Sequence, residues 1–179
     1  ITTAIVPAYK YEDMLGYVRG ECKKGRQAYF VCAKIDDDEG EVTSVTELWE
    51  ELKGRLPDVR FGLLHGRMKD REKSAVMTAF KNHEYDCLVS TTVIEVGVDV
   101  PNATIMVIMN AERFGLSQLH QLRGRVGRGS EKSWCFLMIG SDSDAARERL
   151  GIFKSPSDGF ALAEKDLQLR GSGDRKSVV

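Results

Sequence analysis

Short, continuously apolar runs alternate with amphipathic segments along most of the 179-residue chain, and this alternation constrains the fold most strongly. Strands that are apolar along their whole length are typical of parallel sheets covered on both faces. We therefore expect an α/β fold, an open parallel sheet with helices on both faces. The expected strands are 1–8, 27–33, 59–64, 85–91, 104–109 and 133–139, and the expected helices are 11–24, 43–56, 70–81, 116–126, 142–153 and 157–169.

The alternation stops after Gly140, where two helical segments follow each other. We therefore predict a main domain over residues 1–140 and a short C-terminal helical appendage over 141–179. The acidic run 36–39 follows a predicted strand and is interpreted as a solvated loop. The chain starts at Ile1 rather than at Met, so we interpret it as a piece of a longer protein.

Composition excludes several classes of protein. The net charge is −1, so the chain has no overall positive charge that would attract nucleic acid. Local arginines and backbone amides can still bind it. No apolar stretch approaches the roughly 18 residues of a membrane span. The four cysteines lie far apart without a C-x-x-C pattern, which argues against a zinc site and a disulfide framework. A reducing, cytoplasmic location is expected.

Residues 117–129 read SQLHQLRGRVGRG, with three arginines among three glycines. In a continuous helix, Arg125 and Arg128 would lie three residues apart on one face. Two guanidinium groups on one face suit a polyphosphate, because each presents a planar fork of donors and stays charged. The alternative is a solvated basic helix end, which suffices for Arg123. For Arg125 and Arg128 the three glycines argue against a simple helix end, since each glycine costs a helix roughly 1 kcal/mol.

A second block, STTVIEVGVDVPNA at 90–103, together with 117–129 resembles motifs V and VI of the superfamily-two helicases. The run LHGRM at 64–68 is similar to the motif of the same lobe that touches the DNA backbone. Residues 110–129 and 158–171 look most similar to the RecG-type branch-migrating DNA helicases. The resemblance implies the second RecA-like motor lobe of an ATP-dependent DNA helicase that remodels replication forks and Holliday junctions in recombination and repair.

The resemblance also assigns nucleotide contacts. Arg125 and Arg128 match the two motif VI arginines that reach the γ-phosphate. Gln121 matches a residue that couples the nucleotide to the lobe interface. Asp99 matches the motif V aspartate near the ATP ribose, where a carboxylate accepts hydroxyl hydrogen bonds, although it could also be a turn aspartate. Gly97 permits close backbone approach or a positive φ.

The same resemblance assigns DNA contacts. Thr91 and Thr92 match a contact to the DNA phosphates, and helix or turn capping is their alternative role. His65, Gly66 and Arg67 would contact the strand backbone, although His65 could be a packed histidine at a strand end. Because 91–99 and 65–68 directly follow predicted strands, we expect both segments at the carboxyl edge of the sheet.

A complete motor also needs a P-loop, but the chain contains no Gly-Lys pair. ATP with Mg²⁺ would therefore be held mainly by another lobe, and this chain alone is expected to be inactive. The expected partners are the first RecA-like lobe and a DNA-junction-binding domain of the same parent chain, with duplex or branched DNA. Two alternatives remain: the equivalent lobe of a transcription-repair coupling translocase, and a non-catalytic interaction module.

Overall fold

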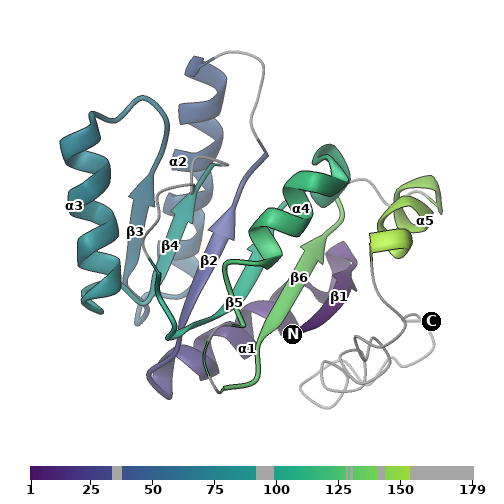
Figure 1. Ribbon diagram of the computed structural model, residues 1–179, viewed down its shortest axis with the longest axis horizontal. Helices are drawn as coiled ribbons and strands as arrows, with labels where there is room; N and C mark the ends of the chain where they lie inside the picture. Colours follow the sequence, from purple (N-terminus) through teal and green to yellow (C-terminus); the bar gives the residue numbers. More distant parts are fainter. Residues whose placement is uncertain (34–37, 92–98, 128, 130, 141–143, 154–179) are drawn as a thin grey trace.

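The computed structural model describes residues 1–33, 38–91, 99–127, 129, 131–140 and 144–153. In this part of the chain, six parallel strands form one sheet in the order β1-β6-β5-β2-β4-β3 (Figure 1). Every strand is almost completely buried, as expected for a sheet covered on both faces. The strands are β1 (Thr2–Val6), β2 (Gln27–Val31), β3 (Phe61–Leu64), β4 (Cys87–Ser90), β5 (Ala103–Ile108) and β6 (Trp134–Met138).

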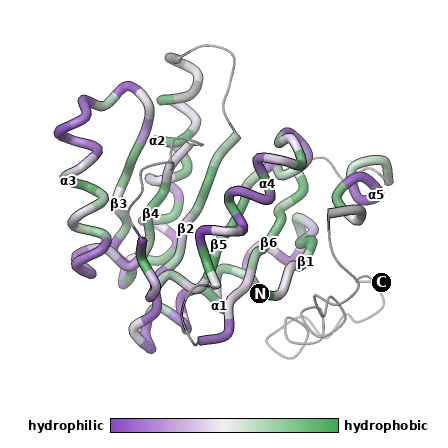
Figure 2. The backbone as a smooth tube through the Cα atoms, viewed as in Figure 1, coloured by the Kyte–Doolittle hydropathy of each residue, from purple (hydrophilic) through white to green (hydrophobic). Residues whose placement is uncertain are grey.

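Helices cover both faces of the sheet. One apolar cluster joins the sheet to α1 and α2, and a second joins the other face to α3, α4 and α5. Figure 2 shows green, apolar strands between helices whose outer surfaces carry most of the purple, polar residues. The helices are α1 (Tyr11–Lys23), α2 (Asp38–Arg55), α3 (Asp70–Lys81), α4 (Leu116–Arg123) and α5 (Asp144–Phe153), with short 3-10 turns η1 (Ala8–Lys10) and η2 (Ala111–Arg113).

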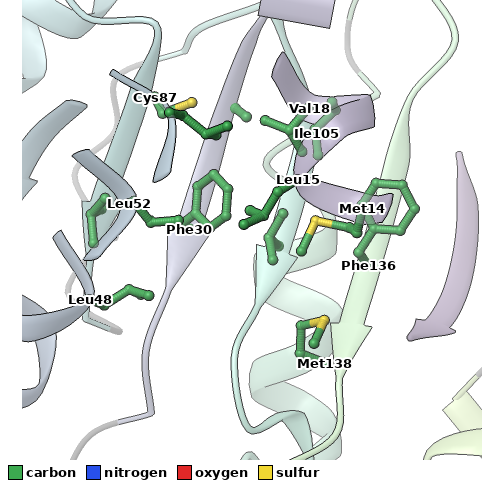
Figure 3. Packing of buried hydrophobic residues seen from close by; sticks show 14 of the residues in the cluster. Met14, Leu15, Val18, Phe30, Leu48, Leu52, Cys87, Ile105, Phe136 and Met138 are labelled. Atoms are coloured by element: carbon green, nitrogen blue, oxygen red, sulfur yellow. The ribbon is translucent and has the colours of Figure 1, made fainter. Parts of the chain in front are cut away.

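The packing of α1 and α2 explains why helical spacing in the sequence was informative. Leu15 of α1 and Leu52 of α2 lie on the two sides of the Phe30 ring, while Met14 lies next to Phe136 and Val18 next to Ile105 (Figure 3). These side chains recur at helical intervals on one face of each helix, so burying them fixes the helix on the sheet. The predicted open parallel α/β sheet with helices on both faces is confirmed.

The largest change in an element boundary concerns α2. Its helix begins at Asp38, five residues before the predicted start, so residues 38–39 of the acidic run belong to a helix and not to a loop. Acidic residues are favourable in the first turn, because the helix dipole places partial positive charge there. Residues 36 and 37 of the same run lie outside the described residues.

Helix α5 packs against the main sheet. Ala146 and Leu150 are buried in the second cluster, and the Arg149 guanidinium donates to the carbonyl oxygens of Glu112 and Phe114 at 3.0 and 2.7 Å. The predicted helix over 157–169 lies outside the described residues. Among the described residues, no helix has the length and apolar character needed to cross a membrane.

Candidate functional site

Two turns from distant parts of the sequence meet at the amino edge of the sheet. The first precedes β5, where the Asn102 carbonyl accepts the Gln27 N–H at 3.1 Å at the start of β2. The second follows α4, which runs back across the sheet toward the start of β6 (Figure 1). A Cβ on Gly129 would lie 3.0 Å from the Pro101 carbonyl oxygen, so the two backbones approach closely and a side chain at this position would be crowded.

This contact corrects the expected position of Asp99. The sequence placed 91–99 as one segment at the carboxyl edge, where β4 ends. However, β4 and β5 belong to one parallel sheet, so the chain must return to the amino edge before β5 begins at Ala103. Asp99 comes four residues before Ala103, so it accompanies the turn at the amino edge, and only Thr91 follows directly from the carboxyl end of β4.

The turn after α4 also differs from the predicted helix over 116–126. The helix ends at Arg123, and Gly124 caps it. The Arg125 N–H then donates to the Leu122 carbonyl at 3.0 Å, and Gly127 has a φ of +83°. The glycines therefore end the helix early, and Arg125 lies in a turn, so the argument from a helical face shared with Arg128 was wrong. Arg128 itself lies outside the described residues.

The charges of Arg125 and Asp99 both act on one buried phenol, that of Tyr29 in β2. Burial raises the pKa of Tyr29 to about 12, the Arg125 guanidinium lowers it and the Asp99 carboxylate raises it. Val100 and Val126, the sequence neighbours of these two charged residues, are buried in the same apolar cluster as Tyr29. Residues next to Arg125 and Asp99 in the sequence are thus buried on the same face of the sheet.

The other predicted residues of this group differ in their surroundings. Gln121 is exposed on α4, whereas Leu119 and Leu122 are buried beneath it, so its amide is available to a group outside this chain. Arg123 donates to the Thr3 hydroxyl oxygen at 3.2 Å, which ties α4 to β1 and fits the structural role inferred for it. Gly97 lies outside the described residues.

Two of the predicted DNA-contact segments lie beside each other at the carboxyl edge. Leu64 pairs with Ser90 at the ends of β3 and β4, so His65 and Thr91 follow neighbouring positions. The Thr91 side chain is fully buried, and its hydroxyl oxygen has no hydrogen-bond partner among the residues that the structure describes. Its predicted hydroxyl contact with DNA therefore has no support in this geometry, because a buried hydroxyl cannot reach a phosphate. Thr92 lies outside the described residues.

The segment after β3 is a compact turn that presents its polar groups outward. The Arg67 N–H donates to His65 Nδ1 at 3.3 Å, and the Met68 N–H donates to the His65 carbonyl at 3.3 Å. In a neutral His65 the ring proton therefore sits on Nε2. Gly66 and Arg67 are exposed, so the turn offers a guanidinium next to α3.

One feature was missed by sequence reasoning. A cavity of about 250 Å³ lies where β2 and β5 end, with α2 as its wall. None of the predicted site residues that the structure describes lines it. The lining residues are Cys32, Ala33, Ser44, Glu47, Leu48, Glu51, Met109, Asn110 and Arg113.

Comparison with known proteins agrees with this arrangement. Residues 9–130 match the family model described as the helicase conserved C-terminal domain. The chain is 51% identical over 176 residues to the ATP-dependent DNA helicase RecG of Synechocystis sp., covering 97% of this chain and 21% of that protein. It is 50% identical over 177 residues to RecG of Escherichia coli K12, covering 97% and 26%. The chain thus spans about a quarter of these relatives.

Among solved structures, a RecG bound to a three-way DNA junction matches with a TM-score of 0.75 and 46% identity, over 98% of this chain and 23% of that one.

Proposed function

We propose that this chain, which belongs to the helicase conserved C-terminal domain family, is the second motor lobe of a RecG-type ATP-dependent DNA helicase. The whole enzyme would remodel branched DNA, such as replication forks and Holliday junctions, in recombination and repair. The observation that supports the proposal is the close approach of the turn after α4, which holds Arg125, to the turn before β5, which follows Asp99, in a chain without a P-loop. Such a lobe can complete a nucleotide site but cannot hold the phosphates alone.

In this proposal Arg125 and Arg128 stabilise the negative charge that develops on the γ-phosphoryl group during ATP hydrolysis. Asp99 accepts a hydrogen bond from a ribose hydroxyl, and Gly97 lets the backbone approach the nucleotide. Gln121, exposed on α4, would couple the nucleotide to the interface between the two lobes.

The P-loop and the Mg²⁺ site would belong to the first lobe. Within the described residues, no group of three or more His, Cys, Asp and Glu side chains could hold a metal ion, so we assign none of them to Mg²⁺. When bound, the ion would neutralise phosphate charge. The role assigned to this chain is to bring its arginines to the nucleotide that the first lobe binds.

On the DNA side we propose that His65, Gly66, Arg67 and Thr92 contact the phosphate backbone. The first three form one turn whose Gly66 and Arg67 are exposed, so the Arg67 guanidinium can bind phosphate without reading base sequence. We do not extend this to the Thr91 hydroxyl, because the side chain is buried.

The finer partners belong to the same proposal. The first RecA-like lobe and a DNA-junction-binding domain would lie in the same longer chain, which fits the span of about a quarter of the RecG relatives. Such an enzyme would act in the cytoplasm, where the bacterial chromosome lies. Residues 141–179, proposed as an appendage, would lead toward the coupling segment.

DNA-stimulated ATP hydrolysis by the full-length protein, together with unwinding of a synthetic four-way junction, tests the proposal. We expect both activities in the full-length protein and neither in the 179-residue chain alone. A full-length protein without ATP hydrolysis would favour the non-catalytic interaction module. A protein that hydrolyses ATP and displaces stalled RNA polymerase, but leaves junctions intact, would favour the transcription-repair coupling translocase.

A further inference from the structure

Hydrogen bonds of Asn102 tie the turn before β5 to the loop between α1 and β2. Asn102 Nδ2 donates to the Gly25 carbonyl oxygen at 2.7 Å and to Gln27 Oε1 at 3.0 Å. The Gln27 N–H donates in return to the Asn102 carbonyl oxygen at 3.1 Å. Asn102 is therefore held through both its side chain and its backbone, and the turn cannot move along the sheet edge without breaking these bonds.

Gln27, the partner of Asn102, is itself fixed in the fold. Only 1% of it is exposed, and its Nε2 donates to the carbonyl oxygens of Phe80 at 2.7 Å and Tyr85 at 2.9 Å. Because the amide nitrogen faces these two carbonyls, Oε1 is the acceptor that faces Asn102. The Asn102 amide must therefore present its NH₂ group, which a carboxylate of the same shape could not replace.

The turn that Asn102 holds leads directly to Asp99. The Ala103 N–H donates to the Val100 carbonyl oxygen at 3.0 Å, which closes a turn over residues 100–103. Val100 is buried, whereas the neighbouring Asp99 is exposed. The buried valine anchors one end of the turn and the Asn102 amide anchors the other. Together they determine where the backbone presents the Asp99 carboxylate at the surface.

The same loop also reaches the segment that follows α4. Arg26 forms an ion pair with Glu131 at 2.7 Å, and the Pro101 carbonyl oxygen lies against Gly129. The ion pair is partly exposed and contributes little to stability. It shows, however, that the loop between α1 and β2 contacts both turns that approach each other at the amino edge. The loop therefore acts as their common support.

We propose that Asn102 is a positioning residue for ribose recognition: its amide, held by Gly25 and Gln27, sets the turn so that the Asp99 carboxylate accepts from a ribose hydroxyl. The inference rests on the proposed function, because it presupposes the nucleotide site to which Asp99 is assigned. Asn102 acts through Asp99 and touches neither the ribose nor the phosphates. Its effect therefore belongs in nucleotide selectivity and KM, and not in the chemical step at the γ-phosphate.

The test is Asn102→Ala in the full-length protein, with kcat and KM for DNA-stimulated hydrolysis measured for ATP, 2′-deoxy-ATP and 3′-deoxy-ATP. The wild type should prefer ATP to at least one analogue by about 10-fold in kcat/KM, as expected for a hydrogen bond to a charged group. Asn102→Ala should reduce this preference to less than about threefold, through a higher KM for ATP. The kcat at saturating ATP should change little.

A matched control separates ribose recognition from general loss of stability. Trp49→Phe removes the hydrogen bond that Trp49 Nε1 donates to the Phe61 carbonyl oxygen at 3.0 Å, between α2 and β3. Both variants lose a side-chain donor to a backbone carbonyl, so both should lower the melting temperature. Only Asn102→Ala should weaken the preference for ATP. An equal weakening in Trp49→Phe would overturn the inference.

A second variant and a double-mutant cycle test the route of the effect. Asn102→Asp keeps the shape but loses the NH₂ donor, so it should weaken the preference for ATP as Asn102→Ala does. If Asn102 acts through Asp99, then Asn102→Ala should raise KM for ATP by less than about twofold in an Asp99→Ala background. Effects on KM that multiply would show that Asn102 acts independently of Asp99 and would overturn the inference.

The remaining outcomes distinguish the two proposals. A wild-type protein without DNA-stimulated hydrolysis, or without any preference for ATP over both analogues, would refute the proposed nucleotide site and the inference with it. A wild-type preference that Asn102→Ala and Asn102→Asp both retain would refute the inference and leave the proposed function intact. If neither variant folded, the inference would also be refuted, because the amide would then serve the fold.

Discussion

The turn after α4 can be tested by replacing Gly127 with alanine. Gly127 has a φ of +83°, which is left-handed backbone that costs an L-residue roughly 1–2 kcal/mol. An added Cβ would lie 3.6 Å from Cβ of Ile1 and 3.9 Å from Cβ of Ser133, which is ordinary van der Waals contact. The whole cost of Gly127→Ala therefore comes from the backbone and not from a steric clash.

The expected loss of folding stability can be measured as a fall in the melting temperature. For a chain of this size, 1 kcal/mol corresponds to about 2–4 °C, so Gly127→Ala should melt roughly 2–8 °C lower. The matched control is Gly16→Ala in α1, where Gly16 is exposed and nothing lies within 4 Å of the added Cβ. Alanine should stabilise this helix by roughly 0.5–1 kcal/mol, so the melting temperature should rise by about 1–4 °C.

The assay is thermal unfolding of the 179-residue chain, followed by circular dichroism, for the wild type and both variants. The opposite signs are the essential part of the prediction, because both variants make the same chemical change. If Gly127→Ala melted at or above the wild-type temperature, the left-handed turn that carries Arg125 would not exist, and the reasoning about the site would fail with it.

Three further predictions follow from other parts of the molecule. Arg67→Ala in the full-length protein should weaken binding to all DNA sequences and reduce the salt dependence by about one counterion, as measured by binding titrations at several salt concentrations; a loss confined to particular sequences would contradict a phosphate contact. Burial raises the pKa of Asp86, but hydrogen bonds from the Arg60 side chain and backbone outweigh it and hold the pKa below its ordinary value of 3.8. The carboxylate therefore stabilises the fold above about pH 4, and this contribution should disappear as the pH falls through the lowered pKa. Urea unfolding between pH 3 and 7 should show that the free energy of unfolding falls less on acidification in Asp86→Asn than in the wild type. An equal fall in both proteins would refute the role of the Arg60–Asp86 pair. The 179-residue chain alone should hydrolyse no ATP, and DNA-stimulated turnover at ordinary enzyme rates of roughly 1–1,000 per second would show that the missing P-loop is not required.

The sequence predicted the fold well because burial on both faces leaves a clear pattern. Helix α3 begins and ends at the predicted residues, since its apolar positions recur at helical spacing and Lys81 is followed by a polar turn. Helix α2 was placed too short, because its first turn is acidic and carries no apolar signal.

The site was harder to predict, because it depends on how distant segments meet. The sequence singled out Arg125 and Asp99, but it gave Arg125 a helical setting and placed Asp99 at the wrong edge of the sheet. Thr91 is a further case: its position in a motif suggested exposure, yet the end of β4 is buried.

The most direct test of the central claim is Arg125→Ala in the full-length protein, with ATP hydrolysis and ATP binding measured on the same sample. An arginine finger contributes roughly 10³- to 10⁵-fold to turnover, and because Arg128 is proposed to share the task, we expect a loss near the lower end of that range. ATP affinity should fall far less, because the arginine acts mainly on the transition state. Arg125→Lys should not restore turnover, since an ammonium lacks the planar fork. Near-normal hydrolysis by a folded Arg125→Ala protein would contradict the claim that this chain supplies the arginine of the nucleotide site.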